Sequence, residues 1–336
     1  MKPMSLSCIC PEILHLHITS RCPYRCVHCC SKTGSSQTSK PLDLEDIEKM
    51  MDQAVGLGIG IFEISGGEPT ALDRRFLLGV LRYASQRGLL TVLNTNGYML
   101  TREYAKRLAE TGLAKIKLSL YGTTPRTNDA FTGFPGSFRK TLNGIEAAKT
   151  AGMEVGVHCV VTPKNLSEML KLPDLLEPRT IDTVQLGAVI PTGRGATASE
   201  YVFSEGERSK AIRELKETYR ELLNHRYFFT IALHPQPEMY PFDRRFCNYL
   251  VERIVVDPKG DVIPCCVLPE DLKRPLGNVK EESLIDICSP QRLRQDLTAY
   301  WLLKGHKAMR KELTYRGVSH CLCCVCVEML RVARSK

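Results

Sequence analysis

Short apolar runs alternate with longer amphipathic segments between about residue 13 and residue 225. The segments between the runs repeat apolar residues at helical spacing, as in 44–58 and in 101–112, where Gly112 supplies a helix stop. Strand–helix units that follow one another in this way predict a parallel sheet. The predicted strands are residues 13–19, 61–65, 89–94, 114–119, 154–162 and 183–190.

One face of the predicted strands is apolar and the other is repeatedly polar. In the first strand, His15 and His17 alternate with Leu14 and Leu16. A parallel sheet covered by helices on both faces would be apolar on both. The alternation therefore predicts a sheet that curls into a partial barrel, with helices outside and a wet interior large enough for a ligand. Other polar residues expected on the interior face are Glu63, Lys117, His158 and Gln185.

The pattern changes after the helical stretch 205–223. Residues 234–242 are rich in proline, and a turn at 258–261 between two apolar runs predicts a β-hairpin. Eight of the fifteen cysteines fall in this last third of the chain. We therefore expect an α/β protein with a partial parallel (β/α)6 barrel over 1–225 and a small cysteine-rich domain over 226–336. Helices in the second domain are predicted at 283–303 and 318–332.

The net charge says little about the function of the protein, whereas its cysteine content is informative. The 46 basic residues exceed the 37 acidic ones but form no dense run, so a nucleic-acid partner is not expected. A secreted disulfide scaffold would be shorter and would need an export signal, which the first residues do not form. No apolar run is long enough to span a membrane. We expect a cytoplasmic protein whose clustered thiols hold metal.

Three cysteines directly follow the first predicted strand. Cys22, Cys26 and Cys29 place three thiolates within eight residues, and a four-iron cluster accepts thiolate ligands. Three ligands leave one iron open for a substrate or cofactor, as in catalytic metal sites. The adjacent Cys30 points elsewhere in an extended loop, so we do not expect it to bind. The alternative is a zinc knuckle in which His28 supplies the fourth ligand.

With these cysteines, the sequence resembles the radical S-adenosylmethionine (radical SAM) superfamily over residues 13 to about 195. The family signature is three cysteines spaced CxxxCxxC after the first barrel strand. The segment Ser65-Gly66-Gly67-Glu68-Pro69, at the end of the second strand, resembles the family's GGEP motif. The resemblance implies that Gly66, Gly67 and Glu68 bind the methionyl amine of S-adenosylmethionine, with glycine letting the backbone approach the ligand closely.

Further resemblances follow the later strands. Asn96 either lines the cofactor site or only makes a turn, and Ser119 corresponds to a serine that contacts the cofactor in the family. His28 stands where an aromatic residue contacts adenine, and the alternative is a solvated loop histidine. Tyr121 replaces an Asp of many members, so no substrate role is carried over to it. Residues 191–195 resemble a glycine–arginine turn found in many relatives, or form a plain loop.

The resemblance implies a reaction and its partners. A reduced [4Fe-4S] cluster would cleave S-adenosylmethionine to a 5′-deoxyadenosyl radical, which abstracts a substrate hydrogen. The reductant would be a protein such as flavodoxin or ferredoxin. The substrate would lie over the barrel mouth between two clusters, near Lys117, His158, Gln185 and Glu63. Cys266 either returns a hydrogen atom to the substrate or is a buried small residue.

A second group of cysteines resembles the Twitch domain, a shortened relative of the SPASM domain that carries one auxiliary cluster. Its expected ligands are Cys247, Cys265, Cys321 and Cys324. Cys323 and Cys326 are the alternative to the last two, and a structural zinc site is the alternative to the cluster. The remaining cysteines, Cys8, Cys10, Cys159 and Cys288, are interpreted as small hydrophobic residues.

Three functions are compatible with these motifs. The first is modification of a ribosomally made peptide, which many proteins of this layout perform. It is weakened because no peptide-recognition domain precedes the first strand. The second is a radical SAM dehydrogenase or epimerase of a sugar or aminocyclitol. The third is a non-catalytic electron carrier or sensor, which would need neither the GGEP segment nor a polar barrel interior.

Overall fold

The computed structural model describes residues 11–34, 41–190, 192–220, 228–232, 253–266 and 273–295. In this part of the chain a single sheet has the strand order β10-β9-β8-β1-β2-β3-β4-β5-β6-β7. Strands β1 to β7 follow the chain and pair in parallel, and β8 pairs in parallel with the other edge of β1. The sheet is open, which confirms the predicted partial parallel barrel.

The six predicted strands match the structure to within two residues at each end. The barrel strands are β1 (Ile13–Thr19), β2 (Ile61–Gly66), β3 (Leu90–Thr95), β4 (Lys115–Ser119), β5 (Glu154–Val161), β6 (Thr183–Ala188) and β7 (Phe228–Ala232). The strands that extend the sheet beyond β1 are β8 (Arg253–Val256), β9 (Asp261–Ile263) and β10 (Gly277–Asn278).

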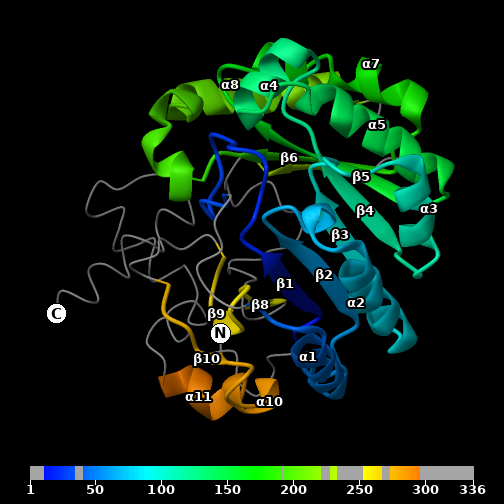
Figure 1. Cartoon of the computed structure of the whole chain (residues 1–336). Helices are drawn as coiled ribbons and strands as arrows, with labels where there is room; N and C mark the ends of the chain where they lie inside the picture. Colours follow the sequence, from blue (N-terminus) through cyan, green and yellow to red (C-terminus); the bar gives the residue numbers. More distant parts are fainter. Residues whose placement is uncertain are drawn as a thin grey trace.

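Helices cover one side of the curved sheet (Figure 1). The apolar strand positions face them, and Leu14, Leu16, Phe62, Ile64 and Leu186 are all completely buried. The longer helices are α1 (Leu44–Gly56), α2 (Arg74–Gln86), α3 (Arg102–Ala109), α4 (Pro125–Thr132), α5 (Ser137–Thr150) and α8 (Glu205–Thr218). The short helices are α6 (Leu166–Met169), α7 (Leu172–Leu176), α10 (Leu284–Ile287) and α11 (Pro290–Gln295), with 3-10 turns at η2 (Pro69–Ala71), η3 (Glu177–Arg179), η4 (Gly193–Thr197) and η5 (Ser199–Tyr201).

Local capping explains where several helices begin. The Asp43 side chain accepts from the Asp46 backbone N–H and the Asp46 side chain accepts in return, so a capping box starts α1. Ser204 and Glu207 start α8 in the same way. The helix predicted at 283–303 begins as two short helices, because Ser289 caps a new start at Pro290.

The predicted hairpin at 258–261 is present, and it continues the barrel sheet. The Asp257 carboxylate accepts from the backbone N–H groups of Lys259 and Asp261, which closes the turn between β8 and β9. Because β8 pairs with β1, and β7 with β6, hydrogen-bonded strands cross the predicted boundary at residue 225. The division into 1–225 and 226–336 stays a prediction.

A buried carboxylate connects four strands on the interior face. The Glu63 side chain, 9% exposed, accepts from Asn94 Nδ2 at 2.8 Å and from Lys117 Nζ at 3.3 Å. Arg253 of β8 forms an ion pair with its other oxygen. Burial alone would raise the pKa of Glu63, but the neighbouring His15, Arg253 and Lys117 hold that pKa well below its usual range. Glu63 is therefore ionised, and it ties β8 to the centre of the barrel.

We expect Glu63→Gln to lower the free energy of unfolding by about 2–3 kcal/mol, because it removes the buried negative charge with which Lys117 and Arg253 form ion pairs. This range is below that of a fully buried pair, since the Arg253 and Lys117 side chains are 25% and 28% exposed. The control is Glu154→Gln, which breaks the pair between Lys115 and a half-exposed carboxylate and should cost about 0.5 kcal/mol or less. Urea unfolding of both variants at pH 7 measures the difference. Equal losses would contradict a special role for Glu63.

Candidate active site

The three cysteines of the predicted cluster lie in the loop after β1. Cys22, Cys26 and Cys29 are free thiols and all are partly exposed. The loop has regular partners on both sides: Cys22 N–H donates to the Gly34 carbonyl at 2.8 Å, and Val27 N–H donates to the Phe131 carbonyl of α4 at 3.0 Å. The loop is thus held in shape by backbone hydrogen bonds of this chain.

The turn after β6 clamps the same loop from another side. The Arg194 backbone N–H donates to the Cys29 carbonyl at 2.9 Å, and its guanidinium donates to the carbonyls of Cys26 and Thr33, both at 2.8 Å. Gly193 precedes it with φ +59°, and a Cβ on Gly193 would lie 2.3 Å from the Cys29 carbonyl oxygen. The predicted glycine–arginine turn is therefore a support for the cysteine loop.

The GGEP segment packs against the first residues of the loop. A Cβ on Gly67 would lie 1.9 Å from the carbonyl oxygen of Arg21, and one on Gly66 would lie 2.5 Å from that of Thr19. The Glu68 N–H also donates to the Arg21 carbonyl at 2.7 Å. These glycines permit contact between two backbones, in addition to the approach to a ligand that the motif suggests.

The carboxylate of Glu68 is buried and fully occupied within the protein. It accepts from the Thr70 backbone N–H at 2.9 Å, from the Thr95 hydroxyl, and from the Asn96 backbone N–H at 2.7 Å. Burial raises the pKa of Glu68, and these hydrogen bonds oppose the rise. The side chain therefore joins the ends of β2 and β3.

Asn96 and Ser119 lie at the ends of β3 and β4. The Asn96 side chain makes the turn, because its Oδ1 accepts from the Tyr98 N–H, and its Nδ2 lies 3.7 Å from the Cys22 sulfur. Both readings of Asn96 thus agree with its position. Ser119 is partly exposed and is the register partner of His158 on β5.

His28 packs against aromatic residues. Its ring stacks on Phe131, with centroids 5.1 Å apart, and lies 4.8 Å from the Tyr121 ring. Its buried Nδ1 has no hydrogen-bond partner in the described structure. Burial lowers the pKa of His28 to about 3, so the ring is neutral and suited to stack on a flat ligand. This placement is unlike a solvated loop histidine.

The thiols suit a cluster better than a single metal ion. Among the described residues, no three His, Cys, Asp or Glu side chains converge as the ligands of one ion. His28, the fourth ligand of the zinc alternative, is packed among aromatic rings instead. In a four-iron cluster each thiolate binds a different iron, so convergence on one point is not needed. The loop and the unpartnered His28 nitrogen fit an iron–sulfur cluster with a cofactor beside it.

The second predicted cluster is described in part. Cys265 is buried and follows β9, whereas Cys247, Cys321, Cys324 and the alternative pair Cys323 and Cys326 lie outside the described residues. Cys8 and Cys10 also lie outside them. Cys159 is buried within the hydrophobic core. Cys30 and Cys288 are partly buried and pack against the outside of that core.

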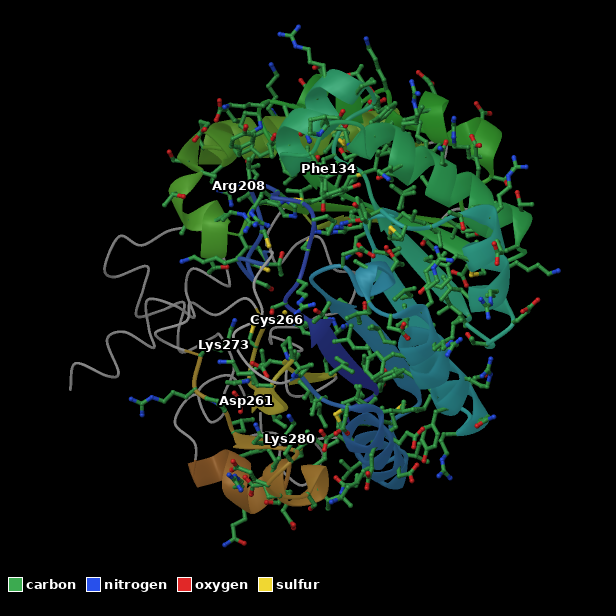
Figure 2. The ribbon with its side chains drawn as sticks, in the orientation of Figure 1. Phe134, Arg208, Asp261, Cys266, Lys273 and Lys280 are labelled. Carbon is green, nitrogen blue, oxygen red and sulfur yellow. The ribbon has the colours of Figure 1, made fainter. Side chains whose placement is uncertain are left out.

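Cys266 lies near the end of β1 (Figure 2). Its thiol hydrogen-bonds with the side chains of Cys265 and His17, which hold the pKa of Cys266 well below the usual thiol value against the effect of burial. His17 belongs to the interior face of β1, so the Cys266 side chain reaches that face.

The polar interior is closed on one side and open on the other. His15 is buried. Its Nε2 forms a hydrogen bond with the Ser65 hydroxyl at 2.6 Å, and its Nδ1 lies 3.3 Å from Arg253 Nη1. On β4 to β6, Lys117 and His158 are partly exposed and Gln185 is exposed, although their apolar neighbours are buried. Burial lowers the pKa of His15 and of His158 to about 4, so both rings are neutral at pH 7. Lys117, His158 and Gln185 are therefore the more accessible polar side chains of the interior face.

Sequence reasoning missed Arg253 and the contacts that Arg194 makes. Arg253 reaches Glu63 only because β8 pairs with β1, and no local pattern announces that pairing. Arg194 was noticed as part of a motif, but its bonds to the cysteine loop depend on the packing of two segments over 160 residues apart.

Comparison with known proteins agrees with this geometry. The family model described as the radical SAM superfamily matches residues 16–176, and the model described as an iron–sulfur cluster-binding domain (SPASM) matches residues 247–326. The chain therefore carries the domains that bind S-adenosylmethionine and [4Fe-4S] clusters. Within the described residues, no helix has both the length and the apolar character to cross a membrane.

Curated relatives fall into two groups. The chain is 32% identical to an AdoMet-dependent heme synthase of Methanosarcina barkeri over 59% of this chain and 56% of that protein. It is 27% identical to a PqqA peptide cyclase of Rhizobium meliloti over 82% of this chain and 73% of that protein. The chain spans between 51% and 58% of the length of the first heme and porphyrin synthases that it matches.

Solved structures share the fold. Streptococcus suis SuiB bound to its precursor peptide SuiA superposes with a TM-score of 0.71 and 18% identity, over 83% of this chain and 64% of SuiB. AdoMet-bound anSMEcpe superposes with a TM-score of 0.68 and 19% identity, over 89% of this chain and 85% of that chain. At these identities the likeness concerns the fold alone.

We expect Arg194→Ala to weaken retention of iron by the cysteine loop, because each charged hydrogen bond that it removes contributes about 1.5–3 kcal/mol. The measurement is the iron content after anaerobic reconstitution and desalting, followed by the decay of visible absorbance with a chelator present. Arg213→Ala, on the exposed side of α8, is the control and should behave like wild type. Equal iron retention by both variants would show that the clamp is dispensable.

Proposed function

This chain belongs to the radical SAM superfamily, and from that membership we propose that it cleaves S-adenosylmethionine reductively and takes a hydrogen atom from a substrate in the barrel. The observation that carries the proposal is the cysteine loop held between the GGEP segment and the turn after β6. When bound, the cluster and S-adenosylmethionine supply a 5′-deoxyadenosyl radical and methionine.

The residues of this chain bind the cluster and orient the cofactor. We assign Cys22, Cys26 and Cys29 as ligands of the first cluster. We assign Gly66, Gly67, Asn96 and Ser119 to the lining of the cofactor site, and the neutral ring of His28 to stacking on the adenine. Glu68 acts as a positioning residue, because its carboxylate is occupied by Thr70, Thr95 and Asn96.

The substrate contacts belong to the open part of the interior. Lys117, His158 and Gln185 lie on neighbouring strands and are accessible there, whereas Glu63 serves the ion pairs that bind β8. The neutral His158 ring can donate or accept a hydrogen bond, which suits a polar substrate group.

The substrate class that we propose is a ribosomally made peptide. Support comes from the PqqA peptide cyclases, whose similarity extends over as much as 82% of this chain and so reaches beyond the barrel strands. A small open reading frame beside the gene would favour this substrate. A non-catalytic electron carrier or sensor would need neither the GGEP segment nor an accessible polar interior, so this alternative does not explain either feature.

A second candidate substrate is an iron porphyrin. It is favoured by the higher identity, 32% and 31%, to an AdoMet-dependent heme synthase and an Fe-coproporphyrin III synthase. Those matches cover 59% and 61% of this chain, which is less than the 82% covered by the match to the Rhizobium meliloti peptide cyclase. A spectral shift of Fe-coproporphyrin III on addition of the protein would favour the porphyrin. The sugar or aminocyclitol alternative stays a prediction.

The first test of the function is release of 5′-deoxyadenosine and methionine by the reconstituted, reduced protein. Replacement of Cys22, Cys26 and Cys29 by Ala should abolish this release, because the cofactor then has no open iron to bind. Chromatography of the quenched reaction measures both products. Cys30→Ala is the matched control, since this neighbouring thiol packs against the core and should leave cleavage intact. Cleavage by the triple variant would refute the assignment.

The second test counts metal. Wild-type protein should hold about eight irons as two four-iron clusters, and the variant with Cys247 and Cys265 changed to Ala should hold about four. Iron, zinc and sulfide are determined on the same sample. A wild-type content of four irons and one zinc would replace the auxiliary cluster by a structural zinc site.

A further inference from the structure

The cysteine loop and helix α4 form a continuous surface with an excess of positive charge. Residues 20–34 and 125–140 together contain six Arg or Lys residues and one acidic residue, Asp129. The two segments are joined directly, because the Arg25 N–H donates to the Thr132 carbonyl at 2.8 Å. Gly133 closes the contact, since a Cβ there would lie 3.3 Å from the Arg25 carbonyl oxygen.

Five cationic residues of this surface are exposed, and one of them, Arg25, also donates from its guanidinium to the Cys22 and Tyr24 carbonyls. The exposed cationic residues, named here the basic face, are Arg21, Arg25, Lys32, Arg126 and Arg139. Asp129 is the acidic residue of these two segments, and its carboxylate accepts from the backbone N–H groups of Gly136 and Phe138 at the start of α5. Burial is the largest single effect on the pKa of Asp129 and raises it, but these hydrogen bonds together outweigh burial and lower the pKa, so the carboxylate is ionised at the start of α5.

A shallow apolar depression lies within the basic face. It is open to solvent and has a volume of about 560 Å³. Its lining residues are Pro125, Arg126, Asp129, Ala130, Gly133 and Pro135. An apolar centre with a charged rim is the usual anatomy of a transient protein interface.

We infer that the basic face docks an acidic protein that carries one electron, such as a flavodoxin. This inference rests on the proposed function, in which each cleavage of S-adenosylmethionine consumes one electron. The carrier loses that electron and the first cluster gains it, with no exchange of atoms. Cys22, Cys26 and Cys29 belong to the same loop as Arg21, Arg25 and Lys32, so a carrier on this face would contact the loop that carries the proposed cluster ligands.

The positive charge of the basic face favours an acidic protein as the partner. Opposite charge around an apolar centre steers an acidic protein into contact and accelerates association at low salt. The basic residues are dispersed over two segments rather than gathered in one dense run, which suits a protein surface more than a nucleic acid backbone.

The experiment compares two reductants on the same variants. Arg126→Glu and the double variant Arg126→Glu/Arg139→Glu reverse charge outside the cysteine loop, and Arg82→Glu on α2 is the matched control, also exposed. Formation of 5′-deoxyadenosine is driven either by reduced flavodoxin or by reduced methyl viologen, a small cation that needs no docking surface. Calorimetric titration with oxidised flavodoxin measures binding without turnover.

We expect Arg126→Glu to lower kcat/KM for flavodoxin about tenfold, and the double variant to lower it further. Binding should weaken in parallel, and added salt should reduce the difference from wild type. Rates with methyl viologen, and all rates of Arg82→Glu, should equal those of wild type.

The inference is overturned if the double variant accepts electrons from flavodoxin as wild type does. It is also overturned if both reductants lose rate equally, since the face would then be structural, or if single-stranded DNA displaces flavodoxin at equal concentration. Failure of wild-type protein to cleave S-adenosylmethionine with methyl viologen would refute the proposed function instead. The titration still decides the docking surface in that case: binding lost on charge reversal supports it, and binding retained overturns it.

Discussion

The backbone of the cysteine loop lies against the backbone of two other segments at separations that leave no room for a side chain: Gly67 meets Arg21, and Gly193 meets Cys29. Gly133 at the end of α4 makes a tight contact with Arg25, where a Cβ would lie 3.2 Å from the Arg25 Cβ. These contacts hold the loop in shape because each neighbour is anchored at the end of a strand or helix. Arg194 adds two charged hydrogen bonds to loop carbonyls. The shape of the metal-binding loop is therefore a property of the whole barrel rim.

Inside the barrel, a buried ionised carboxylate joins neighbouring strands. Glu63 joins Asn94, Lys117 and Arg253, which come from three different strands. The interior around Glu63 is buried, whereas the interior near Gln185 is accessible. The buried part therefore stabilises the barrel, and the accessible part is the part that can contact a ligand. The location of Cys266 beside His17 brings the hairpin that carries Cys265 to the same interior.

The sequence predicts the repeating part of this molecule well and the contacts between distant segments poorly. Strands β1 to β6 follow from apolar runs of regular spacing, and the cysteine and GGEP motifs follow from local patterns. The internal bonds of Glu68 were not predictable, because Thr95 and Asn96 meet it only after β2 and β3 pair. The pairing of β8 with β1 was missed for the same reason, and with it the role of Arg253. The helix expected from residue 283 is interrupted, because local capping at Ser289 overrides the apolar periodicity.

The pairing of β8 with β1 also bears on how the protein is made. Strand β1 acquires β2 as a neighbour early in synthesis, but its other edge pairs with Arg253–Val256, encoded about three quarters of the way along the chain. Contacts of such large sequence separation form late, since loop closure must precede them. Until then the nascent barrel carries an unpaired edge next to the cysteine loop, and unpaired edges invite association with other chains. The ribosome-bound intermediate, more than the finished protein, is thus the form exposed to such association.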